Sequence, residues 1–224
     1  MENFEGEHGH LIQLDKTKID HRYVYRVTKR MADILFSVGG IIALSPLFVL
    51  LAVAIKLEEP SGTILYKQER LGRRGRKFLI YKFRSMCMDA DQKLAQLKKY
   101  NEVGGAMFKM KHDPRVTRVG GRLIRKFSLD ELPQLFNVLR GEMSLVGPRP
   151  PLPHEVEQYS EYDKQRLYVI PGCTGLWQVS ARNEVGFEEM VELDLKYIQK
   201  SNLLYDFTLI LKTVKIMVLP NGAY

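Results

Sequence analysis

An uncharged apolar run of 22 residues, from Ile34 to Ile55, constrains this chain most. About 20 apolar residues suffice to cross a hydrocarbon core of about 30 Å. A buried helix of a soluble domain fits poorly, because such helices seldom run this far without a polar face. A cleavable signal peptide also fits poorly, because the run starts late and no small-residue cleavage pattern follows it. The run therefore predicts a segment that associates with a membrane.

Ser45-Pro46 lies in the middle of this run. An interior proline removes one backbone hydrogen bond and clashes with the preceding helical turn. The two halves, 34–45 and 46–55, would then be about 18 Å and 15 Å long, and neither would cross a bilayer alone. The Ser45 hydroxyl is placed to satisfy a backbone group that Pro46 frees. We therefore expect the helix to break at Ser45-Pro46.

Basic residues flank the run on both sides, with six in residues 16–30 and seven in residues 56–77. Positive charge marks the cytoplasmic face of a membrane, and here both flanks carry it. A hairpin that enters the membrane, breaks and returns to the same face satisfies both flanks. A kinked span remains the alternative, and the charge pattern favours the re-entrant hairpin.

The rest of the chain predicts a helix-rich α+β fold. Strands are expected over 64–68 and 77–84, with a turn at 71–75. Helices are expected over 89–100, 120–127, 129–139, 187–200 and 203–219, and a stiff extended loop over 147–153. In the last helix, an apolar stripe at helical spacing predicts packing against a core or a membrane surface.

The chain has a net charge of +8, and its basic character lies between residues 16 and 150, which hold 27 of the 34 basic residues. Such a basic stripe favours nucleic acid, lipid headgroups or a phosphorylated substrate as partner. The sequence contains no Walker A, G-x-G-x-x-G, H-E-x-x-H or C-x-x-C pattern, and its two cysteines have no metal-like spacing. ATP hydrolysis, dinucleotide redox chemistry and zinc hydrolysis therefore lose most of their support.

Asp130 and Glu131 are the strongest candidates for chemistry. Ser128 and Glu131 have capping-box spacing, so a helix start without further function is one interpretation. Basic residues surround the pair in sequence, however: Arg115, Arg118, Arg122, Arg125 and Lys126 precede it, and Arg149 follows. An ionised carboxylate among cations can bind Mg²⁺ or attack phosphorus. The neighbourhood therefore favours phosphoryl chemistry.

Lys82 and Arg84 belong to a second basic segment and alternate with Tyr81 and Phe83. A solvated charged edge and attraction to anionic lipid headgroups are two interpretations of this segment. Binding of a substrate phosphate is the third, and it suits Lys82 and Arg84 best.

Several motifs in fixed order resemble the bacterial sugar transferases, which are monotopic polyprenyl-phosphate phosphoglycosyl transferases. The resemblance covers about residues 29–224. It rests on Ser45-Pro46 and on YKFRSM (81–86), RLIRK (122–126), SLDELPQ (128–134), SLVGPRP (144–150), PGCTGLWQVS (171–180) and NGAY (221–224).

The resemblance implies transfer of a sugar 1-phosphate from a UDP-sugar to undecaprenyl phosphate, with release of UMP and use of Mg²⁺. Asp130 would be the nucleophile, forming an aspartyl-phosphosugar, and a ligand of the metal. Glu131 would act as general base or as partner to the metal. Arg125 and Arg149 match phosphate-binding positions, Lys82 matches more weakly, and Arg84 and Arg118 join them as candidates from their basic context.

Three regions follow from this resemblance: a polar segment over 1–30, a re-entrant membrane helix over 31–57, and a small cytoplasmic catalytic domain over 58–224. The expected location is the cytoplasmic face of the bacterial inner membrane, at the first membrane step of polysaccharide or glycoconjugate synthesis. Expected partners are the UDP-sugar, undecaprenyl phosphate and inner-membrane phospholipid, without nucleic acid. Whether two copies form a homodimer stays open.

Two positions depart from the family pattern, because Cys173 and Ala181 replace an expected aliphatic residue and a glycine. They lie where sugar or nucleotide recognition is expected, so the sugar stays open. The tail at 221–224 favours UDP-glucose or UDP-galactose. The competing hypothesis is a non-enzymatic basic module that binds anionic membrane or nucleic acid, which leaves Asp130 and Glu131 without a role.

Overall fold

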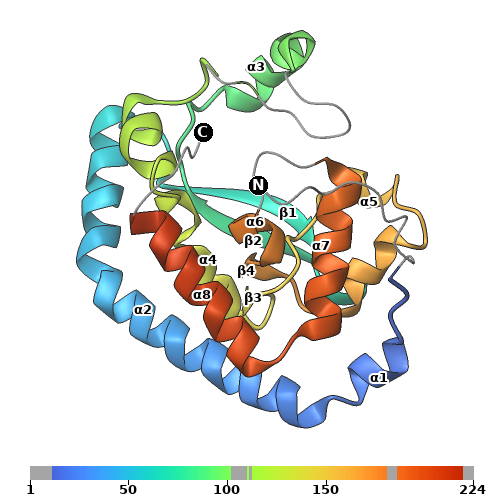
Figure 1. Ribbon diagram of the computed structural model, residues 1–224. Coiled ribbons are helices and arrows are strands. Elements are labelled where there is room, and N and C mark those ends of the chain that lie inside the picture. Colours follow the sequence, from blue (N-terminus) through green and yellow to red (C-terminus); the bar gives the residue numbers. More distant parts are fainter. Residues whose placement is uncertain (1–11, 102–109, 111–112, 181–185, 219–224) are drawn as a thin grey trace, which may run out of the picture.

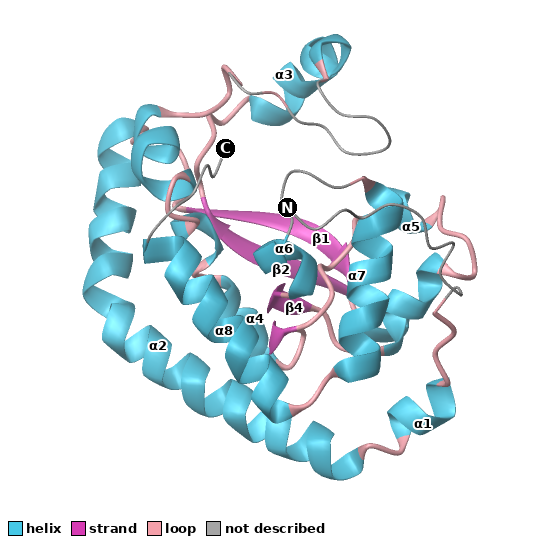
Figure 2. Ribbon diagram, viewed as in Figure 1, coloured by secondary structure: helices cyan, strands magenta, loops and turns pink. Residues whose placement is uncertain are grey.

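The computed structural model describes residues 12–101, 110, 113–180 and 186–218. It is helix-rich and α+β, as the sequence predicts, and Figures 1 and 2 show the helices arranged around two small sheets. The helices are α1 (Lys16–Asp20), α2 (Tyr23–Glu58), α3 (Ala90–Leu97), α4 (Gln134–Arg140), α5 (Pro153–Val156), α6 (Leu176–Ser180), α7 (Phe187–Lys200) and α8 (Leu203–Val218). The strands are β1 (Leu65–Leu71), β2 (Lys77–Phe83), β3 (Ser144–Val146) and β4 (Gly172–Thr174).

The 36-residue helix α2 contains the whole apolar run and continues through Ser45-Pro46. The prediction that the helix breaks at Ser45-Pro46 is therefore wrong, because the backbone stays helical there. Pro46 has no N–H to offer the carbonyl of Ile42, and the Ser45 hydroxyl donates to that carbonyl at 2.8 Å. Because the freed acceptor is satisfied locally, the helix curves around the rest of the molecule instead of ending (Figure 1).

Both halves of α2 are attached to the same folded body. In the first half, Arg30 donates to the carbonyls of Val138 and Leu139, and Asp33 accepts from the backbone N–H of Leu145 at 3.0 Å. In the second half, a buried cluster joins α2 to β2 and to the segment before α4; its fully buried members are Leu51, Ile55, Phe83 and Ile124. The inner side of α2 is thus part of the protein core along most of its length.

β1 and β2 form the predicted antiparallel hairpin. Its register places Tyr66 opposite Lys82 and Arg70 opposite Phe78, so Tyr66, Gln68 and Arg70 lie on the hairpin face that carries Lys82. The turn includes Arg74 and Gly75, both with positive φ.

The fully buried Asn137 of α4 fixes this helix against the hairpin. Its side-chain nitrogen donates to the carbonyl of Leu79 at 2.7 Å, and its oxygen accepts from the N–H of Tyr81 at 3.0 Å. These two bonds hold the middle of α4 against β2, the strand that carries Lys82.

The parallel pair of β3 and β4 pairs Ser144 with Gly172 and Val146 with Thr174. The sequence analysis does not find these three-residue strands, because they are too short for a periodic signal. The main core packs around them and uses α6, α7 and α8; its buried members are Val146, Leu176, Val191, Leu195, Tyr197, Ile198 and Leu209. The predicted helices over 187–200 and 203–219 are confirmed.

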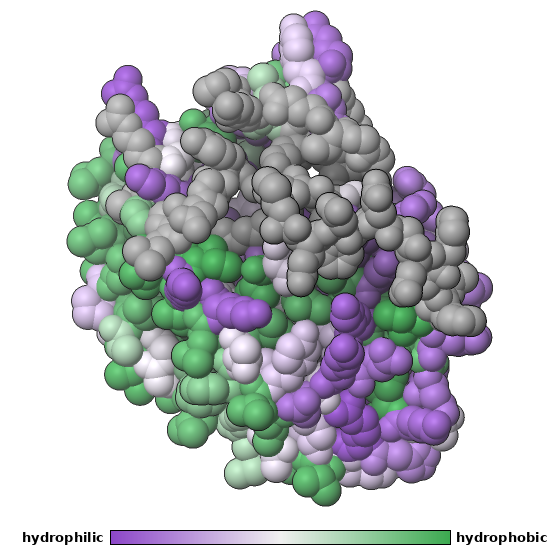
Figure 3. Space-filling view, viewed as in Figure 1, coloured by the Kyte–Doolittle hydropathy of each residue, from purple (hydrophilic) through white to green (hydrophobic). Residues whose placement is uncertain are grey.

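A broad apolar surface remains exposed on the outer side of α2 and on α8, and Figure 3 shows hydrophobic side chains gathered over both helices. Strongly exposed members include Val24, Met31, Leu35, Ile42, Val49, Leu57, Leu204, Leu211 and Val218. In the described part of the chain, α2 is long and apolar enough to cross a membrane, judged by length and composition. A contiguous surface of this kind indicates a membrane or protein partner.

Candidate active site

Asp130 and Glu131 lie in a single 3₁₀ turn, Leu129–Glu131, just before α4. The turn follows Ser128, whose backbone is left-handed with φ 55° and ψ 28°. This conformation is uncommon for a residue other than glycine and is concentrated at functional sites. The Ser128 side chain makes no capping hydrogen bond, so the capping-box interpretation is wrong.

Lys82 of β2 joins the two carboxylates. Its Nζ lies 2.8 Å from Glu131 Oε1 and 3.8 Å from Asp130 Oδ2. The side chains of Lys82 and Asp130 are 24% and 16% exposed, so their charges interact in a partly desolvated environment. Three predicted site residues from different parts of the chain therefore meet at one place.

The groups around Asp130 shift the pKa of its carboxyl in opposite directions. Burial raises the pKa of this carboxyl above its ordinary value, and the adjacent Glu131 raises it further. The cations Lys82 and Arg125 act in the opposite direction and lower the pKa. Burial and Glu131 therefore disfavour the ionised form of Asp130, and the neighbouring cations favour it.

Arg125 ends the π-helical segment Gly120–Arg125, which is the form taken by the predicted helix over 120–127. Glu58, at the end of α2, accepts from the backbone N–H groups of Arg118 and Val119 at 2.7 and 3.2 Å. Gly120 is required for the close approach of this segment to β2, because an added Cβ would lie 2.1 Å from the carbonyl oxygen of Ser85. The membrane-type helix α2 thus helps to position the segment that carries Arg125.

The other predicted phosphate-binding residues have different surroundings. Arg149 lies in the loop after β3, with its guanidinium 5.9 Å from the centre of the Trp177 ring. Arg84 contacts the Thr63 hydroxyl and the Met88 sulfur. The side chain of Arg118 borders a separate pocket, described next. Among the described contacts, only Lys82 and Arg125 are brought to Asp130.

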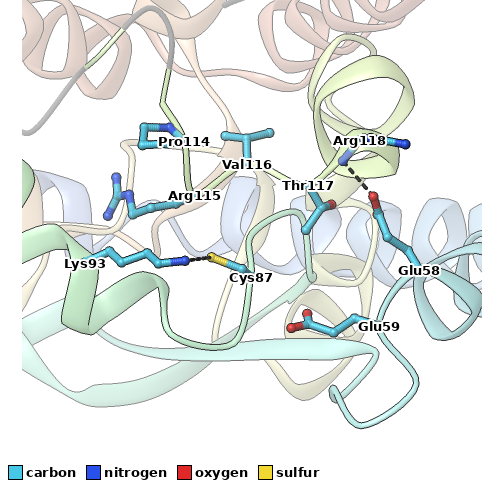
Figure 4. A pocket seen from close by; sticks show the side chains of 9 residues that line it. All are labelled: Glu58, Glu59, Cys87, Lys93, Pro114, Arg115, Val116, Thr117 and Arg118. Atoms are coloured by element: carbon cyan, nitrogen blue, oxygen red, sulfur yellow. Dashed lines mark hydrogen bonds between the residues drawn. The ribbon is translucent and has the colours of Figure 1, made fainter.

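A pocket of about 450 Å³ lies between the end of α2 and residues 114–118, and Figure 4 shows the side chains around it. Its lining residues are Glu58, Glu59, Cys87, Lys93, Pro114, Arg115, Val116, Thr117 and Arg118. Asp130, Glu131 and Lys82 are not among them. The carboxylate pair therefore lies outside this pocket, on a partly exposed surface beside the hairpin.

Two residues near this surface escaped the sequence-based candidate set. Asn137 holds α4 on β2, and Arg70 is a buried cation of β1 whose guanidinium donates to the carbonyl of Pro150 at 3.0 Å. Neither residue stands out in the local sequence, because the role of a buried polar residue depends on partners that are distant along the chain.

Asp130 and Glu131 are also candidate ligands of a metal ion. In the described part of the chain, no group of three or more His, Cys, Asp and Glu side chains is arranged to hold a metal ion. Mg²⁺ is usually held by one or two carboxylates together with substrate phosphates, and Asp130 and Glu131 supply that protein share. The pair already binds one cation, the Lys82 ammonium. These residues therefore fit a Mg²⁺ whose coordination a substrate completes.

Comparison with known proteins identifies the family. The family model described as bacterial sugar transferase matches residues 24–220, which include α2, the Asp130 turn and α8. The chain belongs to the bacterial sugar transferase family. The resemblance inferred from the motifs is therefore confirmed.

Named relatives are similar over most of this chain. The galactosyl transferase CpsE of Streptococcus agalactiae is 43% identical over 91% of this chain and 45% of its own length. The undecaprenyl-phosphate galactose phosphotransferase of Salmonella typhimurium is 44% identical over 89% of this chain and 42% of its own length. The exopolysaccharide production protein ExoY of Sinorhizobium fredii is 42% identical over 88% of both chains. This chain thus spans less than half the length of the first two relatives.

Proposed function

We propose that this bacterial sugar transferase moves a hexose 1-phosphate from a UDP-hexose to undecaprenyl phosphate and releases UMP. The observation that carries the proposal is the contact of Lys82 with both Asp130 and Glu131, next to Arg125. An ionised carboxylate among cations is suited to attack a phosphorus atom, because the cations stabilise the charge that develops on the phosphoryl oxygens. The names of the Salmonella and Streptococcus relatives support galactose or a similar hexose as the sugar.

The reaction proceeds in two displacements at one phosphorus atom. A carboxylate oxygen of Asp130 bonds to the sugar-linked phosphorus of the UDP-hexose, and the bond from that phosphorus to the bridging oxygen breaks. The electron pair leaves with UMP, and an aspartyl-phosphosugar remains. A phosphate oxygen of undecaprenyl phosphate then bonds to the same phosphorus, and the bond to Asp130 breaks to regenerate the carboxylate.

Four further residues of the chain have roles in the proposed reaction. Lys82 holds the Asp130 and Glu131 carboxylates and offsets the negative charge of the arriving pyrophosphate. Arg125 and Arg149 bind phosphate oxygens, and Glu131 serves as general base or as partner to the metal. Asp130 would be the protein ligand of a bound Mg²⁺, which would supply further neutralisation of the pyrophosphate charge.

The protein works from the cytoplasmic face of the inner membrane. The exposed apolar sides of α2 and α8 enter the lipid, and the basic flanks of α2 lie at the anionic headgroups. Arg30 at one end of α2 and Glu58 at the other both bond to the backbone of the same domain. This supports a monotopic arrangement with both ends of α2 on one membrane face, achieved by a curved helix.

The membrane arrangement is tested with reporter tags placed before Ile34 and after Ile55. We expect both tags to report the cytoplasm. A periplasmic position for the first tag would refute the monotopic arrangement and leave a kinked span.

The activity is tested by incubating the purified protein with undecaprenyl phosphate, Mg²⁺ and a panel of UDP-sugars while UMP is measured. We expect release of UMP with a UDP-hexose. Asp130→Asn should abolish turnover while thermal unfolding stays cooperative, because a neutral amide cannot act as the nucleophile. Asp89→Asn is the matched control, since this exposed carboxylate pairs with Lys93. No UMP with any sugar would leave the alternative of a non-enzymatic basic module.

A further inference from the structure

Arg70 is a buried cation that makes no ion pair with any residue in the described part of the chain. It is 6% exposed. One terminal nitrogen donates to the carbonyl of Pro150 at 3.0 Å and the other to Gln68 Oε1 at 2.7 Å, while Nε has no hydrogen-bond partner. All the acceptors that it has are neutral. Among the described residues no carboxylate contacts Arg70, and the two that act on it from a distance are Glu155 and Glu131.

Arg166 shows how this protein otherwise buries a guanidinium. This side chain is 3% exposed, and its Nε and one terminal nitrogen lie 2.8 and 2.7 Å from Asp194 Oδ2. Its other terminal nitrogen donates to the Tyr159 hydroxyl at 2.7 Å. Burying a charge is costly unless an opposite charge and hydrogen bonds accompany it. Arg166 meets that condition within the fold, and Arg70 does not.

A second cation lies close to Arg70. Burial lowers the pKa of Arg70 to about 10, and repulsion from the Arg149 guanidinium contributes in the same direction. The two residues are also linked through the loop, because Arg70 bonds to the carbonyl of Pro150, the neighbour of Arg149. Within the described residues, Arg149 makes no ion pair either. Two adjacent arginines without a contacting carboxylate form a local positive potential that an anion would stabilise.

The position of this pair connects it to the Asp130 turn. Arg70 reaches Gln68, and both share the hairpin face that carries Lys82. The Arg70 side chain therefore runs along this face toward Lys82. Glu131 is one of the charges that act on Arg70, which places the guanidinium within electrostatic reach of the carboxylate pair.

We propose that Arg70 and Arg149 together bind a phosphate group of a substrate, and that this pair extends the phosphate site along the hairpin from Lys82. The inference rests on the proposed function for the identity of the substrate. A guanidinium binds phosphate through two parallel hydrogen bonds, which a lysine cannot reproduce. The phosphate belongs either to the diphosphate of the sugar nucleotide or to the polyprenyl acceptor.

The first arm of the test measures binding without turnover. The dissociation constant of UDP is determined by calorimetry for the wild type, Arg70→Lys and Arg70→Gln. Arg76→Gln, an exposed arginine in the turn of the same hairpin, is the matched control. If the site takes the nucleotide diphosphate, Arg70→Lys weakens UDP binding at least about tenfold, the cost of one charge-assisted contact, and the control does not.

The second arm distinguishes the two phosphate sources by kinetics. KM is measured separately for the UDP-hexose and for undecaprenyl phosphate. A rise in KM for the UDP-hexose, together with weaker UDP binding, assigns the nucleotide diphosphate. A rise in KM for undecaprenyl phosphate alone, with unchanged UDP binding, assigns the acceptor phosphate.

Folding is controlled by thermal denaturation of each variant. Arg70→Lys keeps the charge and remains informative if Arg70→Gln does not fold. A folded Arg70→Lys with wild-type UDP affinity and wild-type KM for both substrates would overturn the inference and leave Arg70 as a support for Pro150. If the wild type releases no UMP but Arg70→Lys still weakens UDP binding, the proposed function fails and the phosphate site stands.

Discussion

Removal of the Lys82 charge is the perturbation whose effect follows most directly from the structure. In Lys82→Gln, Asp130 and Glu131 remain adjacent and lose the cation that contacts both. The ionised form of Asp130 then becomes less favourable, because burial and the Glu131 charge continue to raise its pKa. We expect a lower fraction of active, ionised nucleophile at any given pH.

The magnitude follows from the separation of 3.8 Å between Lys82 Nζ and Asp130 Oδ2. Two unit charges at this distance attract by about 1 kcal/mol in water and by about 4 kcal/mol at the effective dielectric constant of about 20 found near protein surfaces. One pKa unit corresponds to about 1.4 kcal/mol. Loss of Lys82 should therefore disfavour the ionised form of Asp130 by about 1 to 4 kcal/mol and raise the pKa of its carboxyl further.

The assay is the pH dependence of kcat/KM, with UMP release as the signal. In the proposed mechanism turnover requires ionised Asp130, so activity should fall as decreasing pH protonates this carboxylate. The acidic limb of the profile should move to higher pH in Lys82→Gln, and Lys82→Arg should restore most of its position. Lys77→Gln is the control, since Lys77 of the same strand pairs with Glu69 instead. An acidic limb that does not move in Lys82→Gln would refute the electrostatic role assigned to Lys82.

Two further predictions concern stability and membrane binding. Asp194→Asn leaves the buried Arg166 unpaired and should lower the free energy of unfolding by about 3–5 kcal/mol, measured by urea denaturation, whereas a change within 1 kcal/mol would contradict this pairing. Leu204→Gln on the exposed side of α8 should weaken binding to anionic liposomes about tenfold or more, as expected when one buried leucine is lost, while Lys196→Gln on α7 serves as control. Equal liposome binding by Leu204→Gln and the wild type would remove α8 from the membrane surface.

Much of the architecture follows from local patterns in the sequence. The apolar run, the hairpin strands and the helices over 187–200 and 203–219 are periodic or bounded by clear turn residues, and the structure confirms them. The strands β3 and β4 and the short helices α1, α5 and α6 are not found, because three to five residues contain too little periodicity.

Local sequence patterns identify the family, through ordered motifs such as SLDELPQ and SLVGPRP, and they predict membrane association, through 22 uncharged residues between basic flanks. These features are local and can be recognised without knowledge of the fold. The tail at 221–224 and Ala181, which bear on the sugar, lie outside the described residues.

Which of these residues meet depends on how the chain packs in three dimensions. It joins Lys82 to Glu131 across 49 positions, and it buries Arg70 near Arg149 with no contacting carboxylate among the described residues. It also replaces the expected break at Pro46 by a curved helix, because the Ser45 hydroxyl satisfies the carbonyl of Ile42. The physical reason is the same in each case. Hydrogen-bond satisfaction and charge compensation depend on partners that packing brings together, and spacing along the chain does not encode those distances.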